Sequence, residues 1–322
     1  MCPGRVIDSL RGDRDVFSVL RRRHAEGTGP HDRRDHDRVA VVVGGGGMRG
    51  AYAAGMLDAL SSDGWRGAVD VIYGASSGSF LAACFAAGHA GPAAAGFSAD
   101  LASPAFVDLR RFGRRPVLSL DHLVDHVLGV TRPMPWDALA ASRTGVRIVA
   151  TAVDDLRART LDDLRTPDDW RSALRASAAI PIFAGPAVEH RGRFWIDGSI
   201  GEPLALARAV RDGATHVLVL LSRPVSELRP GTDAGLSWWA RALDRARPGL
   251  GSLAQGTRRY GADLAMVTDP DHPDRAGARV AAVEPWRGTG MGALTVDPGP
   301  VGEAVRVGAE SMRAALTGPI TG

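Results

Sequence analysis

The chain has 322 residues, 45% of them hydrophobic and 23% charged, which is typical of a globular protein with a sizeable core. All 39 basic residues are arginine, and they exceed the 36 acidic residues by only three. Without lysine the chain has no Walker A loop, no kinase-type strand lysine and no Schiff-base amine, and so small a charge excess gives no reason to expect a nucleic-acid partner.

The first residues are charged and weakly apolar. Residues 5–23 have an apolar spacing that predicts one or two short amphipathic helices, and residues 24–38 are polar, with glycine and proline, as in a linker. We therefore divide the chain into an N-terminal helical extension and linker, residues 1–37, and a main domain, residues 38–322.

The linker also contains several residue types that bind metals. Arginines crowd these residues, so the composition favours a solvated loop and predicts no metal site. The residues concerned are His31, Asp32, Asp35, His36 and Asp37.

The chain shows no targeting or membrane-spanning pattern. Its N-terminus lacks the apolar run of a signal peptide, and no stretch of about 20 apolar residues predicts a transmembrane helix. Two cysteines cannot form a disulfide framework, and Cys84 is expected to be a small core residue. The expected location is the cytoplasm, which is compatible with peripheral contact at the inner membrane face.

The next stretch reads as strand, glycine turn and helix. Val39 to Val43 predicts a buried parallel strand, four glycines follow at once, and Met48 to Leu60 predicts a helix. Glycine allows a tight turn that leaves backbone N–H groups uncovered.

A second strand and turn follow at once. Val69 to Tyr73 predicts a strand, Gly74 to Gly78 has the pattern G-x-S-x-G around Ser76, and Phe80 to Ala87 predicts a helix. A right-handed crossover makes the two strands parallel, so both turns lie at the same edge of the sheet. Ser76 then sits on a sharp elbow facing N–H donors that can stabilise an oxyanion.

The glycine run also fits a dinucleotide-binding fingerprint. That motif requires an acidic residue at the end of the second strand, near Tyr73, to hold the ribose. The chain has a serine elbow there instead, which argues against a nucleotide cofactor. We expect no organic cofactor and no metal.

The remaining elements alternate between strands and helices. This alternation predicts a three-layer α/β/α fold with a mostly parallel central sheet. The expected helices are Pro92–Ala99, Leu118–Leu128, Trp170–Ser177, Pro203–Arg211 and Val301–Leu316, and the expected strands are Val146–Val153, Phe194–Ile196, His216–Leu221 and Ala278–Val283.

Two polar residues complete the candidate chemistry. Asp197 follows a short strand, precedes Gly198 and can act as the base for Ser76, although an Asp-Gly pair equally fits an ordinary turn. Ser77 is expected to cap the helix after the elbow.

One later helix carries tryptophan on an apolar face. Leu236, Trp239, Ala240 and Leu243 share that face, with arginines away from it. A lipid interface and packing on the domain are both consistent with this pattern, and packing is the simpler interpretation.

These motifs together resemble the patatin-like phospholipase family. The stretch from Gly45 to Gly50 matches its G-x-G-x-x-G element, Gly74 to Gly78 its nucleophile elbow, and Arg175 to Pro181 the stretch that often precedes its Asp-Gly. The resemblance implies an oxyanion hole within Gly45, Gly46, Gly47, Met48, Arg49 and Gly50. It places Asp197 and Gly198 where the family carries the base of a Ser–Asp dyad, although Ser199 and Glu202 depart mildly from the usual pattern.

The resemblance implies a lipid acyl hydrolase that cleaves carboxylic esters of a phospholipid or other acyl glycerolipid. One alternative is an α/β-hydrolase esterase with a Ser–Asp–His triad, for which His272 has the right order in the chain. Another is an inactive relative that binds lipid or nucleotide. The early position of the elbow and the polar, proline-flanked loop around His272 favour the dyad.

Overall fold

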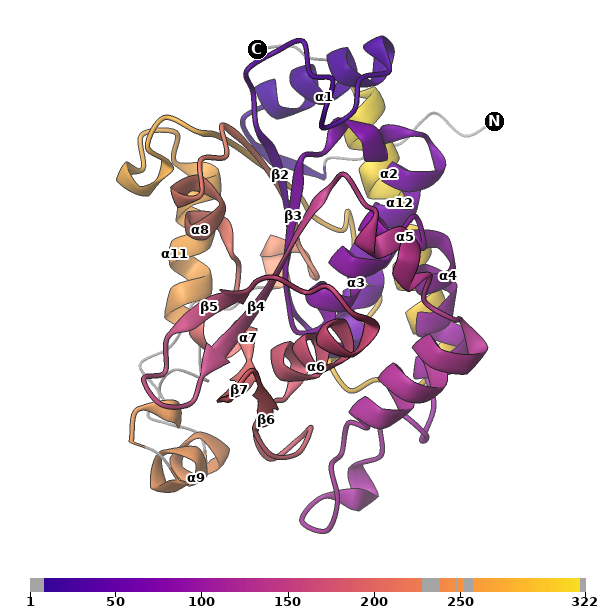
Figure 1. The fold of residues 1–322 in the computed structure, drawn as a ribbon, viewed down its shortest axis with the longest axis vertical. Helices are drawn as coiled ribbons and strands as arrows, with labels where there is room; N and C mark the ends of the chain where they lie inside the picture. The colour runs from indigo at the N-terminus through magenta and orange to yellow at the C-terminus, as the bar shows by residue number, and fades with distance from the viewer. Residues whose placement is uncertain (1–8, 228–237, 247, 252–256, 319–322) are drawn as a thin grey trace.

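The computed structural model describes residues 9–227, 238–246, 248–251 and 257–318 (Figure 1). Its described strands form one nine-stranded sheet in the order β1-β9-β8-β2-β3-β4-β7-β6, with β5 paired to β4. The strand bounds are β1 Leu10–Gly12, β2 Val39–Val43, β3 Val71–Ala75, β4 Gly145–Ala152, β5 Ala158–Leu161, β6 Val188–His190, β7 Arg193–Asp197, β8 His216–Leu220 and β9 Arg279–Val283.

The centre of the sheet is parallel. β9, β8, β2, β3 and β4 run in one direction, whereas β1, β5, β6 and β7 add antiparallel pairs at the flanks. Val39, Val41 and Val43 pack into one core layer, and the alternate residues Ala40 and Val42 pack into another. The sheet is therefore buried on both faces, and the predicted three-layer α/β/α fold is confirmed.

Helices cover both faces of this sheet (Figure 1). One layer contains α1 Asp15–Glu26, α2 Gly50–Ser62, α3 Ser77–Ala86, α4 Ala90–Gly96, α5 Trp136–Ala140, α6 Pro167–Ala178 and α12 Pro298–Thr317. The other contains α8 Leu206–Arg211 and α11 Thr257–Thr268. The parallel strands β2 and β3 both end at the edge where the glycine turn and the serine turn begin.

The N-terminal segment differs from the prediction. Helix α1 covers the second half of the predicted stretch, residues 5–23, and continues to Glu26. The earlier residues Leu10–Gly12 form a strand that pairs antiparallel with β9. Residues 1–8 lie outside the described residues. The polar linker is not a freely solvated loop, because Arg33 and Asp35 in it form ion pairs with Asp70 and Arg23. The domain division after residue 37 stays a prediction.

Other elements differ mainly in their bounds. The helix expected over Leu118–Leu128 begins later, as the π-helical segment His122–Thr131. Leu118 cannot start it, because it forms an antiparallel bridge with Val107. Helix α8 starts at Leu206, three residues later than expected. The other predicted strands and helices are present, most of them shifted by a few residues.

The tryptophan-bearing helix is α9, Trp238–Ala246. Ala240 and Leu243 are buried, and Leu243 packs in a small cluster with Ile196 and Ile200. Leu236 and the side chain of Trp239 lie outside the described residues, so the question of a lipid-facing surface there stays a prediction.

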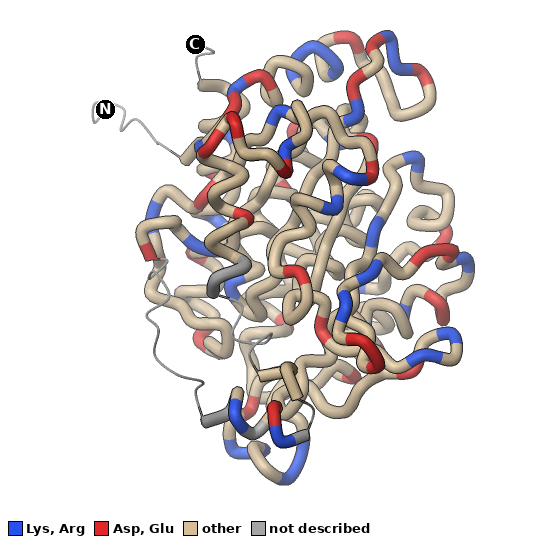
Figure 2. Tube along the Cα trace, turned by 90° about the vertical axis from the view of Figure 1, so that its left-hand side faces the viewer, with Lys and Arg blue, Asp and Glu red and all other residues tan. Residues whose placement is uncertain are grey.

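Acidic and basic residues alternate over the side of the molecule shown in Figure 2. This mixture agrees with the small excess of arginine over acidic residues. None of the described helices combines the length and apolar character needed to cross a membrane.

Candidate functional site

Ser76 joins β3 to α3 in a strained backbone conformation. Its φ of 55° and ψ of −130° are uncommon for a residue with a side chain, and its exposed fraction is 4%. Its N–H donates to the carbonyl oxygen and to the Oγ of Ser177, both at 3.1 Å, and its carbonyl accepts from Ser79 Oγ at 2.6 Å. Ser177 and Ser79 therefore hold the elbow in place. The role of Ser79 was not predicted from the sequence.

The two glycines of the elbow are required by close approach. A Cβ on Gly74 would lie 2.2 Å from the carbonyl oxygen of Gly78, and a Cβ on Gly78 would lie 2.4 Å from that of Val43. The start of α3 thus packs directly on the end of β2. This contact brings the serine turn and the glycine turn together.

The glycine turn lies beside Ser76. A Cβ on Gly45 would come within 3.1 Å of the Ser76 Cβ. The N–H of Met48 donates to Ala293 O at 2.9 Å and that of Arg49 to Gly46 O at 3.2 Å, so neither is free.

The other N–H groups of the predicted oxyanion hole fall into two sets, those with a hydrogen-bond acceptor and those without one. The N–H of Gly50 is used within the helical turn that begins at Gly47. Those of Gly45, Gly46 and Gly47 have no acceptor among the described residues. The turn therefore offers donors from its first half, beside the serine.

Asp197 ends β7 and is completely buried. Its Oδ1 accepts from the N–H of Ser199 at 2.8 Å and from the Ser199 hydroxyl at 2.5 Å. Its Oδ2 has no hydrogen-bond partner among the described residues. A Cβ on Gly198 would lie 3.1 Å from the Cβ of Ala75, which precedes Ser76, so the Asp-Gly pair packs directly against the elbow.

The surroundings of Asp197 favour a carboxyl group that readily takes a proton. Burial raises the pKa of Asp197 above its ordinary value, and hydrogen bonding by Ser199 acts in the opposite direction. The Ser76 hydroxyl also lowers this pKa, although it forms no hydrogen bond of ordinary geometry with Oδ2.

The prediction that Ser77 caps α3 is wrong. Its Oγ is buried and has no hydrogen-bond partner among the described residues. A Cβ on Gly50 would lie 3.0 Å from this Oγ, so the hydroxyl packs against the glycine turn instead of turning to the helix N-terminus.

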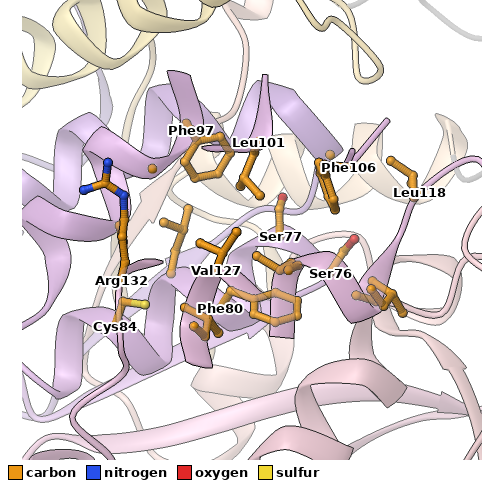
Figure 3. A pocket seen from close by; sticks show the side chains of 18 of the residues that line it. Ser76, Ser77, Phe80, Cys84, Phe97, Leu101, Phe106, Leu118, Val127 and Arg132 are labelled. Atoms are coloured by element: carbon orange, nitrogen blue, oxygen red, sulfur yellow. The ribbon is translucent and has the colours of Figure 1, made fainter. Parts of the chain in front are cut away.

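Two hollows meet at Ser76. The first, about 790 Å³ including its open mouth, is apolar and runs along α3 (Figure 3). Cys84 and Arg132 lie at one end of it, and Ser76 lies toward the other end, where Leu118 is found. Burial raises the pKa of the Cys84 thiol to about 12, in keeping with the predicted core residue.

The second hollow is a more open groove of about 920 Å³, again with solvent included. Arg49, Ser199 and Pro181 are among its lining residues, as is Ser76. The Nε of Arg49 is buried without a partner among the described residues. Burial lowers the pKa of Arg49, and the neighbouring Arg223 acts in the same direction.

His272, the candidate for a triad, lies at the other edge of the sheet, as does His216, which also follows Asp197 in the chain. His272 precedes β9 and His216 begins β8, and both strands run parallel to β2. Their amino ends are therefore remote from Ser76, which follows the carboxyl end of β3.

Acidic residues with a spacing that resembles that of metal ligands form ion pairs with arginines. Asp35 and Asp37 pair with Arg22, and Asp121 and Asp125 pair with Arg175. Within the described ranges, no group of three or more His, Cys, Asp and Glu side chains is placed to hold a metal ion.

Comparison with known proteins agrees with this geometry. A sequence model described as patatin-like phospholipase matches residues 41–210. The uncharacterized protein YjjU of Escherichia coli (strain K12) is 29% identical over 191 residues, 58% of this chain and 52% of that protein. An uncharacterized NTE family protein of Mycobacterium tuberculosis is 30% identical over 210 residues, 65% of this chain and 55% of that protein. The chain thus spans about half the length of these curated relatives.

Among solved structures, VipD from Legionella pneumophila aligns with a TM-score of 0.50 and 13% sequence identity, over 88% of this chain and 67% of that one. This is a likeness of fold. The matched family segment covers more than half of the chain and includes both the serine elbow and Asp197. The chain belongs to the patatin-like phospholipase family.

Proposed function

We propose that this protein is a serine acyl hydrolase that cleaves carboxylic ester bonds of lipids through a Ser76–Asp197 dyad. One observation carries the proposal: a strained, buried serine lies beside a turn of glycine N–H donors, and the Asp-Gly pair that carries a buried carboxyl group with an unpartnered oxygen packs against the serine elbow. A nucleophile, a base and an oxyanion site are the three parts that acyl transfer requires.

In the acylation step, Ser76 Oγ attacks the ester carbonyl carbon and its proton passes to Asp197 Oδ2. The N–H groups of Gly45, Gly46 and Gly47 donate to the oxyanion that forms. When the tetrahedral intermediate collapses, the bond to the alcohol oxygen breaks, and the alcohol leaves with the proton from Asp197.

In the deacylation step, water attacks the acyl carbon on Ser76 and gives its proton to Asp197. Collapse of the second intermediate breaks the bond to Ser76 Oγ, which takes the proton back, and the carboxylic acid leaves. Asp197 thus acts in both steps, and its buried position supports the role because burial raises its affinity for the proton.

The two hollows support a lipid substrate. The apolar hollow along α3 suits an acyl chain, and the open groove with Arg49 suits the polar remainder of a phospholipid or other acyl glycerolipid. A dyad is favoured over a triad because His272 and His216 lie at the opposite edge of the sheet.

Turnover of a soluble p-nitrophenyl ester tests the proposal. The wild-type chain should hydrolyse it, Ser76→Ala should not, and the exposed control Ser62→Ala should match wild type. EDTA should leave the rate unchanged, because a Ser–Asp mechanism uses no Lewis acid. Undiminished turnover by folded Ser76→Ala would refute the proposal.

A further inference from the structure

A loop with an exposed apolar tip stands on a buried base beside the site. Val107 and Leu118 form an antiparallel bridge, and the N–H of Asp108 donates to Val117 O at 2.9 Å. Val107, Val117 and Leu118 are buried, whereas Leu109 is 62% exposed and Phe112 43% exposed. We call residues 108–116 the arginine loop; it protrudes at the lower end of the view in Figure 1.

The arginine loop borders the groove that leads to Ser76. The rings of Phe112 and Phe183 lie 6.3 Å apart, and the N–H of Leu118 donates to Phe183 O at 2.8 Å. Leu118 and Phe183 line the groove, and Ile182, next to Phe183, is 38% exposed. Phe112 of the loop and Ile182 of this neighbouring turn therefore lie at the rim of the groove.

The same loop is strongly basic. Arg110 and Arg111 pair with Asp108, the only acidic residue of the loop. Arg114 and Arg115 are exposed and have no acidic partner among the described residues. The loop therefore combines uncompensated positive charge with exposed hydrocarbon, a pairing that favours an anionic lipid surface.

We infer that the arginine loop docks this protein on an anionic phospholipid bilayer and presents the mouth of the groove to it. The identity of the partner rests on the proposed lipid substrate. Arg114 and Arg115 alone would fit any polyanion, such as a nucleic acid. Leu109 and Phe112, in the same loop, are stabilised only if the partner also offers hydrocarbon in which their side chains can be buried, as a lipid bilayer does.

Co-sedimentation with vesicles tests this inference in the full chain carrying Ser76→Ala, so that the lipid stays intact. The parent should bind vesicles of phosphatidylcholine mixed with phosphatidylglycerol and should bind pure phosphatidylcholine weakly. Arg114→Glu/Arg115→Glu should weaken binding to the anionic vesicles about tenfold or more. Leu109→Ser should weaken it several-fold, and added salt should weaken binding by the parent.

The matched control is Arg34→Glu/Arg143→Glu. It makes the same change in charge at two exposed arginines near the amino ends of β2 and β4, at the opposite edge of the sheet. This control should retain the affinity of the parent. A melting temperature close to that of the parent should accompany each variant, because all the substituted side chains are exposed.

Equal vesicle binding by the parent and both loop variants would overturn the inference, as would binding of the parent to RNA in place of vesicles. Because binding is measured without turnover, the two proposals fail separately. Loop-dependent binding by a chain that hydrolyses no ester would remove only the proposed function. Ester hydrolysis without loop-dependent binding would remove only the docking surface.

Discussion

The two edges of the sheet differ in whether their buried polar groups have hydrogen-bond partners. At the amino edge, the Arg23 side chain is fully buried, and all five of its N–H groups have acceptors on Asp35, Asp70, Asp37 and Ala68. At the carboxyl edge, Asp197 Oδ2, Ser77 Oγ and Arg49 Nε are buried without partners among the described residues. Unpaired buried polar atoms cost stability, and these three come from the glycine turn, the serine elbow and the Asp-Gly pair packed against it, so binding and chemistry are expected there.

The comparison also separates what could be predicted from sequence. The glycine turn and the serine elbow are local patterns, so β2, β3 and the helices after them could be predicted. The three-residue strand β1 depends on pairing with β9, more than 260 residues away, and no local pattern in Leu10–Gly12 reveals it. Likewise, the sequence around Arg23 predicts only a charged residue on an amphipathic helix. Its burial depends on the ion pair with Asp70, which is distant in the sequence.

Within the site, the sequence predicted which residues lie close together but not which of their polar atoms are without hydrogen-bond partners. Ser77 was expected at a cap, because serine has that preference in isolation. Packing against Gly50 overrides the preference. Which N–H groups of the glycine turn are free could not be predicted either. The N–H of Met48 donates to the carbonyl oxygen of Ala293, a residue far away in the chain.

The largest expected effect concerns the carboxyl edge. Asp197→Asn removes the base while keeping the shape of the side chain, and should lower kcat on a p-nitrophenyl ester by about a thousandfold or more. The exposed Asp137→Asn, measured alongside, should match wild type.

The loss of activity in Asp197→Asn should not be accompanied by a loss of stability. Burial raises the pKa of folded Asp197 above its ordinary 3.8, so its contribution to stability is present below that pH and is lost as the pH rises through the folded value. At pH 7 Asp197 therefore contributes less to stability than a neutral side chain of the same shape, and Asp197→Asn should melt no lower than wild type. Inactivity that merely follows unfolding would contradict this account.

A smaller effect is expected for Gly45→Ala. The added methyl group would lie 3.1 Å from the Ser76 Cβ and 3.2 Å from Ala75 O, so it should displace the oxyanion donors. We expect kcat to fall about a hundredfold with a modest loss of stability. Gly302→Ala, whose added methyl would make only ordinary contacts at 3.6 Å, is the matched control. Equal kcat values for the two variants would show that Gly45 has no role in catalysis.

At the amino edge the main loss should be in stability. Asp70 accepts from Arg23, from Arg33 and from the N–H of Val39. Asp70→Asn leaves the buried Arg23 undercompensated and should lower the free energy of unfolding by about 3 kcal/mol. Denaturant titration measures this change. The ester rate of the remaining folded protein should stay within about twofold of wild type, and a larger loss would show that the two edges are coupled.

The smallest effect is expected for His272→Ala. His272 is partly buried in a loop before β9, where its ring accepts from the N–H of Asp274 at 3.3 Å. Its loss should raise the barrier by less than about 1.4 kcal/mol, a factor of ten in rate. A thousandfold loss in a folded variant would favour a Ser–Asp–His triad over the dyad.

The central claim is that Ser76 carries the acyl group, and a fluorophosphonate adduct located by mass spectrometry tests it most directly. The reagent should add once to the native chain, on the peptide containing Ser76, and Ser76→Ala should stay unlabelled and inactive. An adduct on Ser77, or ester hydrolysis that persists in folded Ser76→Ala, would contradict the claim.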